Sequence, residues 1–127
     1  MQQTYRDAED IQDDDLLLRR ITPAQHTAVQ PDGTRVLTSF AFRERNNEFS
    51  MYVAKEVTPE KVLSCGIPTQ ELIEIRAGDV RKLGYILVRE PDDCDDSHVF
   101  AKPREPKSKG QMVKDCKALA EIVNAQR

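Results

Sequence analysis

Glycine and histidine are scarce in this chain of 127 residues, and that scarcity excludes several kinds of site. The five glycines are scattered singly, so the sequence contains neither a Walker A phosphate loop nor a dinucleotide-binding fingerprint. It also lacks a nucleophile-elbow motif and any cysteine-centred catalytic signature. Of the two histidines, His98 has Cys94 at a ligand-like spacing, but no second Cys/His pair completes a zinc site. We therefore expect neither a metal nor a cofactor.

Long apolar runs are also missing. The amino terminus has neither the basic nor the apolar region of a signal peptide, and no run approaches the length of a membrane span. We therefore expect a cytoplasmic protein without a membrane partner. The three cysteines, Cys65, Cys94 and Cys116, lie at wide spacings, and in a reducing compartment such an odd set is expected to consist of free thiols.

The charge of the chain is unevenly distributed. The net charge of −3 disfavours nucleic acid as a partner, because dedicated nucleic-acid binders are normally basic. Residues 1–15 contain six acids and one base with little apolar material, so we expect this segment to be disordered. Residues 16–127 are predicted to form a single domain. Residues 102–117 carry six bases and two acids, so the acidic and basic segments either attract one another, or each binds a partner, or they are two solvated faces.

Alternating patterns predict a mainly antiparallel sheet. Residues 35–42 and 49–53 alternate in side-chain character on either side of Asn46-Asn47, which is typical of a hairpin. The loop at residues 90–96 is acidic and is interpreted as solvated. Further strands are predicted at residues 16–21, 71–76, 85–88 and 98–101, and a turn at residues 31–33.

Capping signals predict the helices that pack against this sheet. Ser108 and Gln111 form a capping box, which begins an amphipathic C-terminal helix. Thr58-Pro59 begins a short helix, and residues 79–83 form another. The predicted fold class is therefore α+β, with a mainly antiparallel sheet packed by the C-terminal helix and one or two short helices. The apolar stripe of the C-terminal helix consists of Met112, Val113, Cys116, Leu119, Ala120 and Val123.

Five side chains are candidates for a site that binds an anion or another small ligand. Alternation places His98 and Lys102 on one side of a strand, where they either hold a phosphate or carboxylate or are an edge histidine and a solvated lysine. Arg19 and Arg20 lie in an apolar strand, so one of them points to the core side. That arginine either recognises an anion through two hydrogen bonds or forms a structural ion pair with an acid. If the strand that contains Tyr52 lies next to the strand at residues 16–21, Tyr52 lines the same cleft as that arginine.

A series of short motifs resembles a group of small bacterial proteins that have no assigned activity. These motifs span most of the predicted domain. The resemblance implies a bacterial protein, but it brings no activity to transfer. The motifs are Leu18-Arg19-Arg20-Ile21, Asp32-Gly33, Ser39-Phe40-Ala41-Phe42, Ser50-Met51-Tyr52-Val53-Ala54 and His98-Val99.

A weaker resemblance is to ADP-ribosyltransferase-like domains, including the RES toxins. These domains place an Arg or His in a first strand and a Tyr in a later unit, and Arg19 or Arg20 with Tyr52 is similar to that order. No glutamate matches the catalytic acid of that family. The resemblance implies NAD binding, or a degenerate ADP-ribosyltransferase, as an alternative function. Because no convergent catalytic set is present, we predict instead a non-enzymatic interaction or accessory module of a toxin or defence locus. Its expected partner is another protein, with a small anionic ligand as the alternative.

Overall fold

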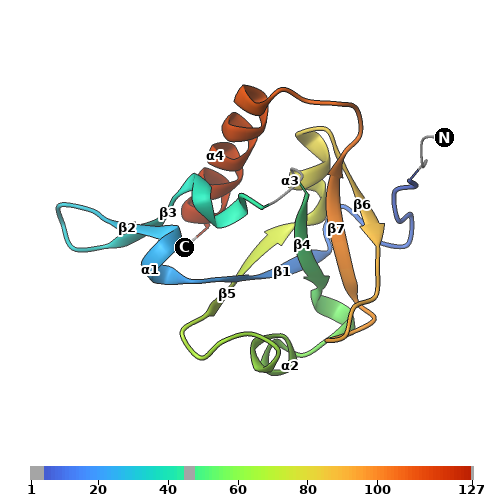
Figure 1. Cartoon of the computed structure of the whole chain (residues 1–127), viewed down its shortest axis with the longest axis horizontal. Coiled ribbons are helices and arrows are strands. Elements are labelled where there is room, and N and C mark those ends of the chain that lie inside the picture. The colour runs from blue at the N-terminus through green and yellow to red at the C-terminus, as the bar shows by residue number, and fades with distance from the viewer. Residues whose placement is uncertain (1–4, 45–47, 127) are drawn as a thin grey trace.

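A five-stranded antiparallel sheet organises the chain, and helix α4 (Lys109–Ala125) covers one of its faces, which we call the inner face (Figure 1). This computed structural model describes residues 5–44 and 48–126. The strands lie in the order β5-β1-β4-β7-β6, and every neighbouring pair is antiparallel. The predicted α+β class is therefore confirmed. The strands are β1 (Leu16–Ile21), β4 (Phe49–Val53), β5 (Glu71–Arg76), β6 (Tyr85–Arg89) and β7 (His98–Pro103).

Helix α4 begins where the capping signal predicts. The Ser108 Oγ accepts a hydrogen bond from the Gln111 N–H at 3.1 Å. The Gln111 side chain donates to Asp115, one turn further on, so the reciprocal half of the predicted capping box does not form. Val113 does not widen the buried stripe as predicted, because its side chain is exposed. The buried apolar residues of the helix are Met112, Cys116, Leu119, Ala120 and Val123.

Three short α-helices within the described residues complete the fold, and two of them, α2 (Pro59–Ser64) and α3 (Ala77–Lys82), contact strands of the sheet. The Thr58 Oγ1 caps helix α2 by accepting from the Lys61 N–H at 3.2 Å, as the sequence predicts. Helix α3 stops before Gly84, whose φ of +92° is a left-handed conformation that glycine adopts without strain. A further short helix, α1 (Pro23–His26), follows β1.

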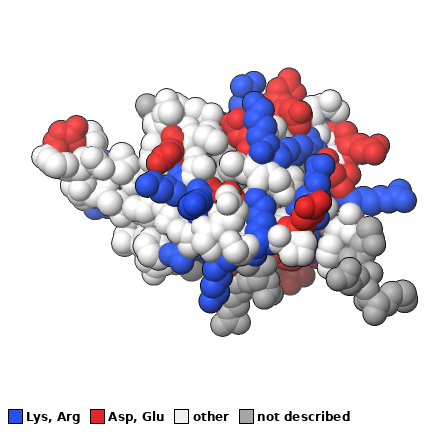
Figure 2. Space-filling view, turned by 90° about the horizontal axis from the view of Figure 1, so that it is seen from above, with Lys and Arg blue, Asp and Glu red and all other residues white. Residues whose placement is uncertain are grey.

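The predicted hairpin between residues 35–42 and 49–53 is wrong. Strand β3 (Arg35–Leu37) pairs with β2 (Thr27–Val29), and β4 pairs with β1 and β7. The chain leaves the extended conformation after Leu37 and forms a 3-10 turn, η1 (Ser39–Phe42), because the buried Phe42 packs in the main core. Strands β2 and β3 form an arm that projects from the body, as Figures 1 and 2 show. The predicted turn at Asn46-Asn47 lies outside the described residues.

The acidic N-terminal segment is ordered from residue 5 onward, contrary to the expected disorder. Ile11 is only 1% exposed and belongs to the main core. The Ala8 N–H donates to the Leu87 carbonyl at 2.8 Å, which attaches the segment to strand β6. The burial of Ile11 and the ion pairs of the acids with Arg81 and Arg89 therefore hold the segment on the sheet, although it has few apolar residues. The segment belongs to the same folded unit as the sheet. Residues 1–4 lie outside the described residues.

The expectation of three free thiols is also wrong. Cys65 and Cys94 form a disulfide across 29 residues of sequence, whereas Cys116 is free and buried. Folding brings the end of helix α2 against the loop that precedes β7, and this proximity leaves no trace in the cysteine spacing. No helix within residues 5–44 and 48–126 is long and apolar enough to cross a membrane.

Candidate functional site

The sheet separates one of the five candidate residues from the other four. Alternation along β1 directs Arg19 to the inner face, where it contacts Phe42, and directs Arg20 to the opposite, outer face, where it contacts Tyr52. His98 and Lys102 lie on the outer face as well, since both contact the ring of Phe100. The prediction that one arginine points to the core side is confirmed, and that arginine is Arg19.

The partners of Arg19 are backbone carbonyls and a glutamate that hold it within the fold. Its side chain donates to the carbonyl of Ala41 at 2.7 Å and to the carbonyl of Ser50 at 2.8 Å, and it forms an ion pair with Glu44. The residue is 6% exposed, so its charge is held by these groups away from solvent. Arg19 therefore ties η1 to β4 and is not available to a ligand.

The outer face brings Arg20, Tyr52 and Asp92 together. The Arg20 guanidinium lies 5.5 Å from the centre of the Tyr52 ring and donates to the Val62 carbonyl at 2.8 Å. The Tyr52 hydroxyl donates to Asp92 Oδ2 at 2.6 Å. Burial, together with this hydrogen bond to a carboxylate, raises the pKa of Tyr52 to about 12. Tyr52 therefore stays protonated at neutral pH and acts as a hydrogen-bond donor.

His98 is paired with Tyr52 across strands β4 and β7 and is 3% exposed. Its Nδ1 is 2.6 Å from the Glu90 carbonyl, which can only accept, so Nδ1 carries the proton. Its Nε2 is 3.7 Å from Asp92 Oδ2, and its ring meets that of Tyr52 at a centroid distance of 5.1 Å. The histidine is thus fixed on both sides by the acidic loop at residues 90–96.

The Arg20, Tyr52 and Asp92 side chains line a pocket of about 360 Å³, whose rim includes the Cys65–Cys94 disulfide. Burial raises the pKa of Asp92, but hydrogen bonds from Tyr52 and from two backbone N–H groups outweigh it and lower the pKa below its usual value. The pocket also includes Asp93, so it presents two carboxylates and one guanidinium. This balance is less favourable to an anion than the sequence suggested.

Lys102 lies further along β7 and has its own acidic partners. Its Nζ is 2.9 Å from Glu90 and 3.4 Å from Glu48, and it sits 3.9 Å from the centre of the Tyr5 ring. Burial lowers the pKa of Lys102, but the bond to Glu90 and the nearby negative charges outweigh it and raise the pKa above its usual value. The backbone carbonyl of Glu90 therefore binds His98, and its carboxylate binds Lys102. Glu90 occupies the position between these two side chains where the sequence predicted an anion.

A buried polar network was missed by the sequence reasoning. Asp115 is 3% exposed and accepts from the Tyr85 hydroxyl at 2.9 Å and from Lys107 Nζ at 2.7 Å. Lys107 also donates to the Leu83 carbonyl. The one available signal was the spacing of Gln111 and Asp115, four residues apart on the predicted helix. The network anchors the start of α4 to β6 and α3.

A hollow with a mixed apolar and charged lining lies between η1 and α4, and we call it the η1–α4 groove. It has a volume of about 220 Å³. Val113, whose side chain is exposed, lines the groove. The exposed ring of Phe40 does not line it but lies against the lining residue Arg43, whose guanidinium carbon is 4.9 Å from the ring centre. Cys116 forms part of the floor, and burial raises the pKa of its thiol. The lining residues are Phe42, Arg43, Glu44, Lys109, Met112, Val113 and Cys116.

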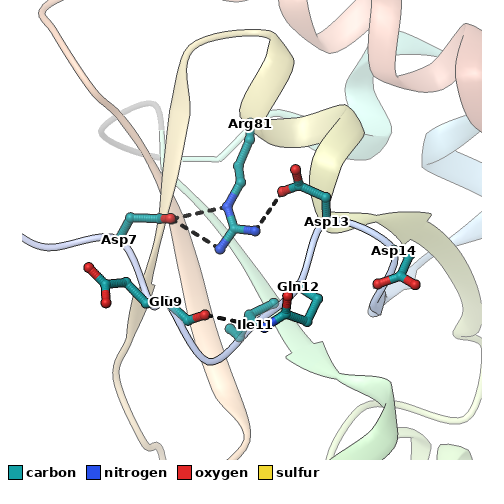
Figure 3. A pocket seen from close by; sticks show the side chains of 7 residues that line it. All are labelled: Asp7, Glu9, Ile11, Gln12, Asp13, Asp14 and Arg81. Atoms are coloured by element: carbon teal, nitrogen blue, oxygen red, sulfur yellow. Dashed lines mark hydrogen bonds and ion pairs between the residues drawn. The ribbon is translucent and has the colours of Figure 1, made fainter.

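A further hollow, of about 510 Å³, is lined mostly by acidic residues (Figure 3). It lies between the N-terminal segment and α3, and Arg81 forms ion pairs with Asp7 and Asp13 there. Within the described ranges, no group of three or more His, Cys, Asp or Glu residues is arranged to hold a metal ion.

Comparisons of the chain with family models, with curated proteins and with solved structures find no match.

Proposed function

We propose that this chain is a non-enzymatic interaction module that binds a segment of another protein in the η1–α4 groove. The observation that carries the proposal is the exposed apolar side chain of Val113 in the lining of that groove, with a second, Phe40, packed on the lining residue Arg43. Val113 is 40% exposed and Phe40 is 55% exposed, although the adjoining Phe42 is fully buried. Apolar side chains that gather at a hollow are typical of a surface that a partner covers.

The charges at the groove indicate the chemistry of the partner. Arg43 and Lys109 lie at its rim. The carboxylate of Glu44, the acid in the lining, is already engaged by Arg19 and by the Ser50 N–H. A segment with one bulky apolar side chain beside an Asp or Glu would fill the hollow and meet the two cations.

Three of the candidate ligand-binding side chains support the same conclusion. Tyr52 and His98 are held by the acidic loop, and Lys102 is held by two carboxylates. A general base needs an open lone pair within reach of a substrate, and a nucleophile needs an adjacent base. This arrangement favours a structural role for these side chains over a catalytic one.

Selection of displayed random peptides on the immobilised chain tests the proposal. We expect enriched peptides to combine a bulky apolar residue with an acidic one and to bind Val113→Glu at least tenfold more weakly than the wild type. Val29→Glu is the matched control, because Val29 is an exposed valine on the β2–β3 arm. Enriched peptides that bind Val113→Glu as well as the wild type would refute the groove as the binding site.

A small ligand on the outer face is the second candidate function. The convergence of Arg20, Tyr52 and Asp92 at one pocket favours it. With two carboxylates and one guanidinium, the pocket would suit a ligand that carries both an amino and an acidic group better than a polyanion such as NAD. Calorimetry with amino acids, phosphate and NAD tests this candidate, and binding that survives Arg20→Ala would exclude the pocket.

A further inference from the structure

The acidic N-terminal segment lies along the outer edge of strand β6, which is the last strand of the sheet. We call residues 7–15 the strap. The Ala8 N–H donates to the Leu87 carbonyl, and the Leu87 N–H donates to Asp7 Oδ1, each at 2.8 Å. Both backbone groups of an edge residue are therefore satisfied by the strap. Further along, the Ile11 side chain enters the main core and is 1% exposed.

Basic side chains from three elements bind the acids of the strap, and one of them is Lys55 of the 3-10 turn η3 (Ala54–Glu56), which binds Asp15 at 2.8 Å. Arg81 on α3 is 3.1 Å from Asp7 and 2.8 Å from Asp13, and Figure 3 shows its guanidinium between these two carboxylates. Arg89 on β6 binds Asp10 at 2.7 Å. Three acids at intervals of three residues thus meet two arginines along one edge of the sheet.

We propose that the β6 edge, with Arg81 and Arg89, is a recognition site for an acidic extended segment of another protein, and that the strap is its intramolecular occupant. This site is separate from the η1–α4 groove and does not depend on the function proposed above. The partner segment would carry acids three residues apart and one aliphatic residue that takes the position of Ile11.

The first part of the strap is held by contacts that a partner segment could replace, whereas the carbonyls of Asp13 and Asp15 accept from the N–H groups of Gly78 and Ala77 and keep the end of the strap in place. The Asp10 and Asp13 side chains are 66% and 76% exposed, so solvent screens their ion pairs, and such pairs contribute little to stability. The strap satisfies the Leu87 N–H with the Asp7 carboxylate instead of a backbone carbonyl. A segment that adds to the edge as a regular strand would supply carbonyls in register along β6. It would meet the same two arginines.

A fluorescent synthetic peptide of residues 5–15, added to the full chain, tests the proposal by anisotropy. The wild type should bind it weakly, because its own strap fills the site. Ile11→Ala, which removes the apolar anchor of the strap, should bind the peptide at least tenfold more tightly, with an affinity that falls as salt is added. Adding Arg81→Gln or Arg89→Gln to Ile11→Ala should reduce that affinity at least tenfold.

Three further variants show whether the peptide binds at the β6 edge. Lys82→Gln changes an exposed neighbour on α3 and should leave peptide binding unchanged. Val113→Glu changes the η1–α4 groove and should also leave it unchanged, which distinguishes this test from that of the proposed function. If Ile11→Ala fails to fold, judged by circular dichroism, Asp7→Ala loosens the strap without altering the core, because it removes the acceptor of the Leu87 N–H and a partner of Arg81. A folded, loosened variant that does not bind the peptide, or that binds it independently of both arginines, would overturn the proposal.

Discussion

Reduction of the Cys65–Cys94 disulfide should destabilise the protein strongly. The bond joins residues 29 apart in sequence. Closing a loop of that length removes about 12 cal/mol/K of entropy from the unfolded chain, which corresponds to about 3.6 kcal/mol at 25 °C. For a domain of this size, that loss should lower the urea midpoint by about 1–3 M. Urea titrations with and without a thiol reductant, followed by far-UV circular dichroism, measure the difference.

Two controls make this prediction sharp. The double variant Cys65→Ser, Cys94→Ser should unfold at the midpoint of the reduced wild type and should not respond to reductant. In unfolded, unreduced wild type, thiol titration should detect the single thiol of Cys116. Three titratable thiols, or equal midpoints with and without reductant, would refute the reasoning. The bond also holds the acidic loop against α2, so its reduction should shift the Tyr52 signals in NMR spectra.

The core, a buried carboxylate and the strap each supply a further test. Leu119→Ala should lower the free energy of unfolding by about 2–5 kcal/mol in urea because it leaves a cavity, whereas Val113→Ala on the exposed side of α4 should change it by less than about 0.5 kcal/mol. Burial raises the pKa of Asp115, but its hydrogen bonds outweigh that effect, and its pKa lies below the usual value of 3.8. Its stabilising contribution is therefore complete above about pH 4 and is lost as the pH falls through the lowered pKa, so the urea midpoint of Asp115→Asn should fall less steeply below about pH 4 than that of the wild type. Deleting residues 1–13 removes Ile11 from the core and should lower the melting temperature by about 5–10 °C, and an unchanged value would contradict the observed packing.

Local signals in the sequence identified most of the regular elements. The caps at Thr58 and Ser108 mark the starts of α2 and α4 because a hydroxyl that accepts an orphan N–H acts within one turn of helix. The strands at 16–21 and 71–76 were found with their observed bounds, since apolar stretches between breaking residues are also local features.

Alternation misled where the tertiary environment overrode it. Residues 38–42 have the pattern of a strand but lie in the connection and the 3-10 turn beside α4, where Asn124 holds both backbone groups of Leu37 at the end of β3. The composition of residues 1–15 predicted disorder because composition counts the charges of a segment but does not show where their partners lie. Arg81 and Arg89 are 68 and 79 residues away in sequence from Asp13 and Asp10, the acids that they bind.

The sequence by itself determined the fold class, the helix starts, most strands and the side of the strand on which His98 and Lys102 lie, because propensity, capping and alternation act over a few residues. Only the tertiary structure decided which arginine faces the core, that Cys65 meets Cys94, that Glu90 stands between the predicted anion ligands and that the acidic segment docks on β6. Each of these is a contact between segments far apart in sequence. Such contacts depend on the order of the strands in the sheet and on which face of the sheet each helix covers. Neither can be inferred from patterns within a few residues of one sequence.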